Sequence, residues 1–480
     1  MSNDTPDNTA RRGAPRAPEP RMGDSRASEP CRGALRASAT DAMPYGPATN
    51  VTPSGDATNV TPCGAATNVT PCRGAPRAPA AEGGTMRAKT AAKRVAVTLA
   101  RHASYDILVP LAYRRAAIQP VDPRKVVFVI EKGDTLPSAY SVMLPYLRDV
   151  IGMDVRVHVI GFNTGIGRAE HLRRSIALAR EVATASVVFL DDASREISCL
   201  PLRPETKVVQ LWHACGAFKK WGASTEGRIF GDSIKKIKRH PYYANLSLVT
   251  VSAPEVAWAY REAMLLEDTP QVVQPLGVSR TDVFFDDAFI EQSFRDLYEQ
   301  VPQAAGKKVL LYAPTFRGHV EGAEAPNALD VEQLAAELGE DWVLLINHHP
   351  FVKTRPAIPA GCESFAFDVT GKLPIDQLLV VADTMVTDYS SVVFEYSLTN
   401  RPMCFFAYDL EDYDDWRGFY YPYEEMTPGP VVRTTTEVAA FVRNAATAFD
   451  DTEVRTFRNR FMTSCDGHST QRIWQAICAL

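Results

Sequence analysis

A turn between a predicted strand and a predicted helix has the residue types that bind anions. The apolar pair Met385-Val386 leads into Thr387-Asp388-Tyr389-Ser390-Ser391, and we expect a helix to begin on the two serines. Backbone N–H groups at a helix start lack partners within the helix and lie at the positive end of its dipole, and serine hydroxyls add donors. The turn therefore predicts a phosphate site, in which Asp388 could orient the turn. A simple helix N-cap is the alternative.

Two histidines follow predicted strands. His213 comes directly after the strand 208–212 and is followed by Lys219 and Lys220. A histidine at a strand end can take a proton from an attacking hydroxyl near neutral pH, whereas a structural role is the alternative. His349, next to His348, follows the strand 342–347. Adjacent histidines can suggest a metal, but no third ligand stands at a suitable spacing.

Arginines and a carboxylate accompany the other strand ends. Arg280 precedes Asp282, Thr315 and Arg317 follow the strand 309–312, and Arg417 comes after an acidic loop. The forked donors of arginine suit phosphate, whereas a salt bridge of Arg280 to Asp282 or Asp286 and a solvent-facing Arg317 are the alternatives. One turn into the helix that begins on the serines, Glu395 could accept a hydrogen bond from a ribose hydroxyl. Helix solvation is its alternative.

The sequence predicts no metal centre and no cofactor. The nine cysteines form no CxxC pair and no Cys/His set at metal spacing. Asp191-Asp192, at another strand end, would fit Mg²⁺, but the Asp-x-Asp form is absent. Cys215 lies next to His213, yet a small buried residue is the simpler interpretation than a thiol nucleophile.

Strands and helices alternate from residue 126 onward, which predicts parallel sheets covered by helices on both faces. We expect strands at 126–130, 155–160, 185–190, 208–212, 246–251, 309–312, 342–347, 364–367, 384–386 and 403–406. We expect helices at 138–150, 169–182, 255–264, 288–301, 331–338, 374–381, 392–398, 436–447, 452–461 and 468–479. The predicted plan is two doubly wound halves, 121–300 and 301–480, that meet at a cleft where the strands end.

The N-terminal part differs from this body. Residues 1–85 repeat Ala-Thr-Asn-Val-Thr-Pro, have few large apolar side chains and are predicted to be disordered. Met86 is the expected biological start, with a genuine disordered arm as the alternative. Residues 86–120 carry seven basic residues against Asp106, and Val95, Leu99, His102 and Asp106 fall at helical spacing. They predict an amphipathic helix on an anionic membrane surface or a solvated helix on the first domain, interrupted at Pro110.

Composition excludes several classes of protein. A net charge of −5 gives no signal for nucleic-acid binding, and apolar residues at 45% are ordinary for a globular chain. No run approaches the length of a membrane span, and residues 1–30 lack the apolar stretch of a signal peptide. We therefore expect a cytoplasmic protein that does not bind nucleic acid.

These clusters, in this order, resemble the signature of the CDP-glycerol glycerophosphotransferases, which include the teichoic acid polymerases and primases. The resemblance rests on five segments: Trp212-His213 before the lysines, 277–282, Tyr312-Ala313-Pro314-Thr315-Phe316-Arg317, His349-Pro350 and 386–419. Ser279 replaces a proline of the family. Ala214-Cys215-Gly216 departs from the family's usual Gly-Thr-Pro, which leaves open whether Lys219 or Lys220 faces the site.

The resemblance implies a GT-B-like fold and transfer of glycerol phosphate or ribitol phosphate from CDP-glycerol or CDP-ribitol to a hydroxyl of a lipid-linked acceptor. His213 would be the general base, and His349, Ser390, Ser391 and Arg417 would hold the pyrophosphate. Such an enzyme would work as a peripheral protein on the inner face of the membrane. The short catalytic body favours a priming role. The alternatives are a GT-B glycosyltransferase, a sugar-nucleotide epimerase and a non-catalytic polymer-binding protein.

Overall fold

The computed structural model describes residues 97, 99–162, 164–228, 231, 233–318 and 322–480. The predictions for the tail 1–85 and for the first part of the basic segment, up to residue 96, lie outside these described residues.

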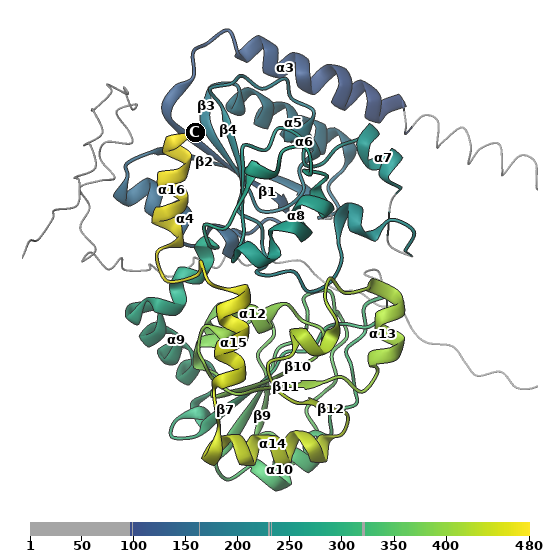
Figure 1. Ribbon diagram of the computed structural model, residues 1–480, viewed down its shortest axis with the longest axis vertical. Coiled ribbons are helices and arrows are strands. Elements are labelled where there is room, and N and C mark those ends of the chain that lie inside the picture. Colours follow the sequence, from purple (N-terminus) through teal and green to yellow (C-terminus); the bar gives the residue numbers. More distant parts are fainter. Residues whose placement is uncertain (1–96, 98, 163, 229–230, 232, 319–321) are drawn as a thin grey trace, which may run out of the picture.

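The first half of the molecule is built on a parallel sheet with the strand order β2-β1-β3-β4-β5-β6 (Figure 1). Its strands are β1 (Asp122–Lys132), β2 (Asp154–Phe162), β3 (Ala185–Leu190), β4 (Lys207–Gln210), β5 (Leu248–Thr250) and β6 (Val273–Gln274). In the centre, Val127 pairs with Val188 and Phe128 with Phe189. All of β1 from Val126 to Val129 is inaccessible to solvent, as expected for a strand covered on both faces.

The second half has a parallel sheet with the order β12-β11-β10-β7-β8-β9. Its strands are β7 (Lys308–Tyr312), β8 (Trp342–Ile346), β9 (Ala366–Asp368), β10 (Thr384–Thr387), β11 (Met403–Phe406) and β12 (Val431–Val432). The chain order reverses between the neighbours β7 and β10, and in the first sheet between β1 and β3. Ligands of doubly wound sheets bind beyond the carboxyl ends of strands at such reversals.

Helices cover both faces of each sheet. Those before the second sheet are η1 (Ala103–Leu108), α3 (Val109–Ala116), η2 (Ser138–Tyr140), α4 (Met143–Pro145), η3 (Tyr146–Val150), α5 (Arg168–Val182), α6 (Arg195–Ser198), η4 (Gly222–Thr225), α7 (Ile234–Arg239), η5 (Pro254–Val256), α8 (Ala257–Met264), η6 (Pro270–Val272), η7 (Ser279–Phe285), α9 (Asp287–Gln300) and η8 (Pro302–Ala304). Those that follow β7 are α10 (Val331–Leu338), α11 (Ile375–Val381), α12 (Val392–Ser397), α13 (Leu410–Arg417), η10 (Tyr423–Met426), α14 (Thr435–Ala448), α15 (Thr452–Phe461) and α16 (Ser469–Ala479).

The last helix, α16, returns to the first half and lies beside β2 and α4 (Figure 1). Ile473, Trp474 and Ile477 join the core that contains Phe128 and Tyr140. The start of α16 is fixed from the first half as well, because the carboxylate of Asp282 accepts hydrogen bonds from the backbone N–H groups of residues 469 and 470, at 3.0 and 2.8 Å. The alternating pattern of the sequence gives no sign of this return.

Contacts between the halves centre on the loop after His213. The backbone N–H of Lys220 donates to Gly418 O at 3.0 Å, and that of Tyr420 donates to Phe218 O at 3.1 Å. Gly216 has a positive φ of 63°, and a Cβ at this position would lie 2.1 Å from the Phe394 ring of α12. Only glycine therefore allows this loop to approach α12 so closely.

The predicted fold class is confirmed, since the chain forms two doubly wound parallel α/β halves. The bounds predicted for β3, α10, β11 and α15 agree with the structure. The helix predicted at 138–150 is instead split into η2, α4 and η3, and β6, β12 and α13 were not predicted. Pro110 lies in the first turn of α3, directly after the π-helical turn η1; the backbone stays helical through Leu108 and Val109, so the helix changes from π to α geometry there but does not end.

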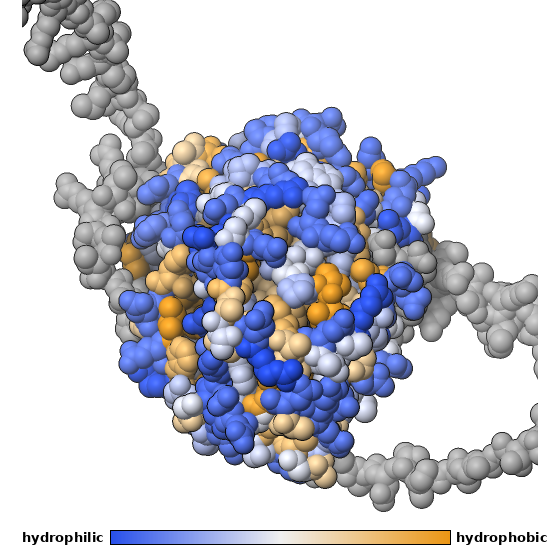
Figure 2. Space-filling view, turned by 60° about the horizontal axis from the view of Figure 1, so that its bottom comes forward, coloured by the Kyte–Doolittle hydropathy of each residue, from blue (hydrophilic) through white to orange (hydrophobic). Residues whose placement is uncertain are grey.

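The surface of the face drawn in Figure 2 is mainly hydrophilic, and apolar residues gather there in small groups. Among the described residues, no helix has the length and apolar composition that crossing a membrane would require.

Candidate functional site

His213 lies just beyond the end of β4 and is held by the loop that follows β3. Its Nδ1 lies 3.0 Å from the backbone O of Asp191 and 3.9 Å from Oδ2 of Asp192. Because a carbonyl oxygen can only accept, Nδ1 carries the proton in this contact and the Nε2 lone pair remains available. The side chain is 47% exposed, so Nε2 can receive a proton from a bound molecule.

The surroundings of His213 keep its imidazole neutral. Burial of the ring by neighbouring protein lowers the pKa of His213 below 6.5, and Lys132 and Arg280 lower it further, whereas Asp192 raises it. Lys132 Nζ pairs with Asp192 Oδ2 at 2.5 Å and so weakens the effect of that carboxylate. A neutral imidazole near pH 7 has the protonation state that a general base requires.

Trp212 fixes the direction of His213. Its φ is 61°, which is unusual for a large side chain. The Trp212 indole stacks on the ring of Trp221 and on that of His213, with centroids 4.4 and 4.5 Å apart. The strained backbone is therefore held in place by aromatic stacking on both sides.

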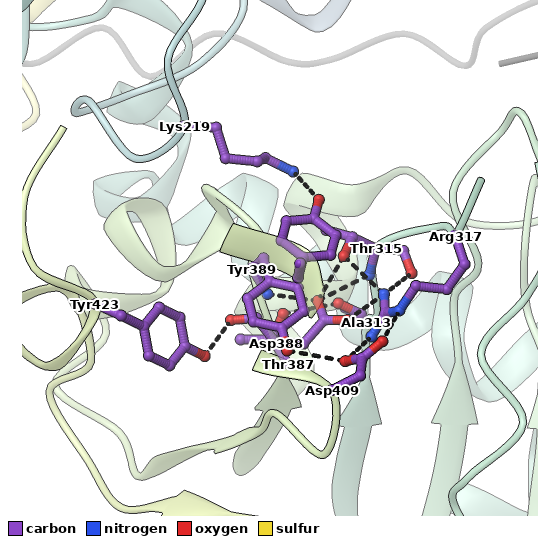
Figure 3. A network of polar contacts seen from close by, with 10 residues as sticks. Lys219, Ala313, Thr315, Arg317, Thr387, Asp388, Tyr389, Asp409 and Tyr423 are labelled. Atoms are coloured by element: carbon purple, nitrogen blue, oxygen red, sulfur yellow. Dashed lines mark hydrogen bonds and ion pairs between the residues drawn. The ribbon is translucent and has the colours of Figure 1, made fainter. Parts of the chain in front are cut away.

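The carboxylate of Asp388 organises the strand ends of the second half (Figure 3). It lies after β10, is 1% exposed, and its Oδ1 accepts from Thr315 N at 2.9 Å, Thr315 Oγ1 at 3.0 Å and Tyr389 N at 2.6 Å. Thr387 Oγ1 donates to Ala313 O at 2.8 Å and joins the same two strand ends. Asp388 thus orients the turn, at the reversal between β7 and β10.

Two carboxylates hold Arg317 at this site. Its Nη1 lies 2.9 Å from Asp388 Oδ2, and its Nε lies 2.6 Å from Asp409 Oδ2. Burial alone would lower the pKa of Arg317, but Asp388 and Asp409 raise it above its ordinary value. The charge of Arg317 is therefore balanced within the protein. The alternative, in which Arg317 faces the solvent, is wrong.

Aromatic side chains connect this network to the first half. Lys219 Nζ donates to Tyr413 Oη at 3.2 Å, and the Tyr413 ring stacks on that of Tyr389 with centroids 3.8 Å apart (Figure 3). Tyr389 Oη in turn donates to Asp409 Oδ1 at 2.8 Å. Of the two lysines, it is Lys219 whose amino group reaches the second half, whereas Lys220 does so through its backbone N–H.

The two serines lie where the sequence predicted them, at the start of α12. Ser391 is the N-cap residue but makes no side-chain capping bond, and Ser390 Oγ accepts from Val392 N at a long 3.4 Å. Both are partly exposed. Their hydroxyls are thus little used in capping, so they can donate to a ligand.

Arg280 and Glu395 are brought together away from solvent. Arg280 is 5% exposed, its Nη1 lies 2.5 Å from Asp376 Oδ1, and its Nη2 is ion-paired with Glu395 Oε1. The alternative partners Asp282 and Asp286 are not used: Asp282 binds the start of α16 and Asp286 caps α9. Arg280, in η7, is therefore joined to Asp376 in α11 and to Glu395 in α12. Their predicted contacts with a ligand stay predictions.

His349 lies beside the end of β7. Its Nδ1 accepts a hydrogen bond from Phe351 N at 3.2 Å, and its ring is 4.9 Å from that of Phe316. His348 is 5% exposed, and burial lowers its pKa below 6.5. Of the two histidines, His349 is thus the more accessible. Arg417 is the last residue of α13, and the position of its side chain lies outside the described part of the chain.

No group of three or more His, Cys, Asp or Glu side chains in the described residues has the arrangement of a metal site. Asp192 is engaged by Lys132, as described above. Cys215 is 1% exposed, and burial raises its pKa well above that of a free thiol, which disfavours a nucleophilic role.

Comparison with known proteins decides the family. Residues 111–479 match the model of the CDP-Glycerol:Poly(glycerophosphate) glycerophosphotransferase family. The chain belongs to this family. The resemblance seen in the sequence is thereby confirmed, and the protein is a transferase of the CDP-glycerol glycerophosphotransferase type.

Several members of this glycerophosphotransferase family are similar to the chain. The teichoic acid ribitol-phosphate primase of Bacillus spizizenii is 35% identical over 75% of this chain and 92% of the primase. The teichoic acid poly(ribitol-phosphate) polymerase of the same organism is 34% identical over 78% of this chain but only 58% of the polymerase. The structure of the wall teichoic acid polymerase TagF agrees in fold, with a TM-score of 0.63, 23% identity, and coverage of 83% of this chain and 98% of that chain.

Some residues of the glycerophosphotransferase site were not predicted individually. Asp409 holds Arg317, Tyr389 and Tyr413 form the stacked pair, and Asp376 binds Arg280. Asp409 follows β11 as the other polar residues follow their strands, so the rule of strand ends could have found it. Nothing in the local sequence marks Asp376, because its partner is 96 residues away.

Proposed function

We propose that the protein transfers an alditol phosphate from a CDP-alditol to a hydroxyl of a lipid-linked acceptor and releases CMP. Membership of the glycerophosphotransferase family supports the reaction type. The observation that carries the proposal is His213, whose neutral imidazole has its Nδ1 held by Asp191 O and its Nε2 directed away from that contact.

In the proposed reaction, His213 Nε2 removes the proton of the acceptor hydroxyl as its oxygen attacks the β-phosphorus of the donor. The new O–P bond forms as the bond from phosphorus to the pyrophosphate oxygen breaks. CMP leaves with that electron pair. The product is a phosphodiester, and the proton returns from His213 to water.

The donor is held, in this proposal, at the carboxyl ends of the second sheet. The hydroxyls of Ser390 and Ser391 and the ring of His349 contact the pyrophosphate, and Lys219 adds a positive charge from the first half. Thr315, Arg317, Thr387 and Asp388 act by fixing the geometry of the turn, since the polar atoms of Thr315, Arg317 and Asp388 bond to one another and Thr387 Oγ1 bonds to Ala313 O. Arg417 completes the pyrophosphate site.

The substrate is proposed to be presented at a membrane, with the protein on its cytoplasmic face. The amphipathic helix of the first half has the exposed apolar residues Leu99, Ile107, Leu108 and Leu111, and Ile118 is exposed just after it. The same segment carries Arg114 and Arg115. An apolar stripe with basic neighbours suits an anionic lipid surface.

A ribitol-phosphate priming reaction is the form we favour. The ribitol-phosphate primase relative is matched over 92% of its length, whereas the matched polymerases are longer proteins, covered to 58% and 63%. A glycerol-phosphate primase of Bacillus subtilis is less similar, at 29% identity. CDP-ribitol is therefore the favoured donor and CDP-glycerol the second candidate.

The test is nucleotide release by the full chain, measured separately as CMP from CDP-ribitol, as CMP from CDP-glycerol and as UDP from UDP-N-acetylglucosamine. Each donor is supplied with and without a lipid-linked disaccharide that ends in a glycerol phosphate. We expect release that depends on the acceptor and is fastest with CDP-ribitol, with a product extended by one unit. Release of UDP instead would indicate a glycosyltransferase. No release from any donor, while the acceptor still binds, would indicate a non-catalytic polymer-binding protein.

A further inference from the structure

A second site lies in the first half, separate from the strand ends described above. A cavity of about 250 Å³ opens between the N-terminal helix and the elements α6 and α7. Its polar lining includes Tyr105, Asp106, Arg114, Arg195, Ser198, Arg239 and His240. None of the residues assigned to donor or acceptor chemistry lines this cavity.

The cavity carries an excess of positive charge. Three arginines line it, against the single carboxylate of Asp106, which is itself 2.6 Å from His102 Nδ1. Within the described part of the chain, no carboxylate forms an ion pair with Arg114, Arg195 or Arg239. Burial, together with Arg195, Arg239 and His102, lowers the pKa of His240 below 6.5. The cavity arginines Arg195 and Arg239 thus contribute to the lowered pKa of His240, against the opposite effect of Asp106.

Arg195 gives this charge a specific position. It is 8% exposed, its guanidinium carbon lies 4.1 Å from the centre of the Tyr105 ring, and its Nη2 lies 3.4 Å from His240 Nδ1. Neither partner is a carboxylate, and the buried Glu196 is bonded to Tyr105 Oη, at 2.8 Å, and to His171 rather than to Arg195. A buried cation without a directly paired carboxylate is costly, so an anion in the cavity would stabilise it. The forked donors of arginine match phosphate oxygens.

Apolar side chains adjoin the cavity on the same helix. Pro110 and Arg114, one helical turn apart, both line it, and the exposed Leu111 lies between them in sequence. Leu108, on the preceding turn, is also exposed, at 42%. A phosphate-sized positive cavity beside exposed apolar residues has the chemistry of a whole lipid molecule: an anionic headgroup and hydrocarbon chains.

We propose that this cavity binds the phosphate headgroup of an anionic membrane lipid while Leu108 and Leu111 enter the hydrocarbon boundary. General adsorption to a membrane needs only a diffuse basic surface. In this proposal, Arg114, Arg195 and Arg239 instead all bind one headgroup. Arg195 is three residues after Asp192, in the segment whose Asp191 carbonyl holds His213. In this proposal, the bound headgroup fixes the orientation of the first half relative to the membrane.

The test uses vesicle flotation, which needs no donor and is independent of the proposed reaction. Arg114→Ala/Arg239→Ala removes two exposed cavity arginines. Lys235→Ala/Lys238→Ala removes two exposed charges from the same helix α7 that do not line the cavity, and is the matched control. Vesicles of phosphatidylcholine are used with and without phosphatidylglycerol, and thermal melting of both variants verifies folding.

We expect the arginine variant to lose about 100-fold in affinity for the phosphatidylglycerol vesicles and the lysine variant about tenfold, because only the former loses direct bonds to phosphate. Equal losses would overturn the proposal in favour of a diffuse basic surface, and so would undiminished binding of the arginine variant. Titration with inorganic phosphate and with short-chain phosphatidylglycerol identifies the source. If phosphate alone binds as tightly as the short-chain lipid, the site takes a free anion and the lipid proposal fails.

Discussion

The polar residues at the strand ends of the two halves differ in how far the protein itself engages them. In the first half, His213 is anchored through one ring nitrogen and is about half exposed. In the second half, Thr315, Arg317 and Asp388 are bonded to one another and largely buried. The difference separates a group that is available to react from groups that hold a turn in shape. It predicts opposite consequences for substitution in the two halves.

The largest expected effect on activity is at His213. His213→Ala should lower CMP release about 100-fold or more, the usual contribution of a general base, and should lower the melting temperature only slightly, because the side chain is half exposed and Trp212 keeps its stacking on Trp221. His468→Ala, which removes another exposed histidine, is the control. If His213→Ala retained the activity of the control, the half-exposed site would not be the reacting one.

The largest expected effect on stability is at Arg280. Arg280→Met should destabilise the protein by about 3–5 kcal/mol, because it leaves the buried carboxylates of Asp376 and Glu395 without a counter-charge. Urea unfolding measures this change. Arg295→Met, which breaks an exposed pair with Glu291, should cost less than about 1 kcal/mol and is the matched control. Equal stabilities of the two variants would place Arg280 with the ligand-binding residues.

A smaller loss is expected at Asp388. Asp388→Asn keeps the shape of the side chain but weakens its bonds to Arg317 and to Thr315, which should cost about 2 kcal/mol of stability. Because the turn carries Ser390, the KM for the CDP-alditol should rise more than kcat falls. Steady-state kinetics separate the two parameters. A fall in kcat with an unchanged KM would mean that Asp388 takes part in the chemical step.

The smallest expected effect is a shift in pH dependence. The protein lowers the pKa of His213 below 6.5, so kcat/KM should stay high at neutral pH and fall only as the pH drops through that lowered pKa. Asp192 raises this pKa, so Asp192→Asn should move the acid limb to still lower pH. Lys132 and Arg280, which lower the pKa, remain in the variant. An acid limb that moves upward in Asp192→Asn would contradict this assignment of the base.

The local sequence predicted many of the strands and helices but not which residues pair between them. The apolar runs of β3 and β11, and the helical spacing of Val454, Phe457 and Phe461 in α15, determine the element types, and the predicted bounds agree with the structure. The segment 138–150 misled, because Pro145, which has no backbone N–H, stands inside it where α4 gives way to the π-helical turn η3. The two-residue strands β6 and β12 carry too few residues for any periodicity to appear.

The same division holds at the candidate site. The sequence by itself determined which residue types stand at the strand ends, because a parallel strand followed by a helix must present its next few residues at one edge of the sheet. It determined His213, His349, Thr315 and the serines as candidates for that reason. It also marked the N-terminal helix as basic and amphipathic.

Only the tertiary structure decided which of these polar groups are free to act. Arg280 meets Glu395 across 115 residues, Arg317 meets Asp409 across 92, and α16 returns to the first sheet. Such pairings are set by how distant elements pack, within one half or between the two, which leaves no local period or spacing in the chain. A buried charge takes whichever opposite charge the packing brings within reach, since leaving it unpaired costs more than any local preference can offset.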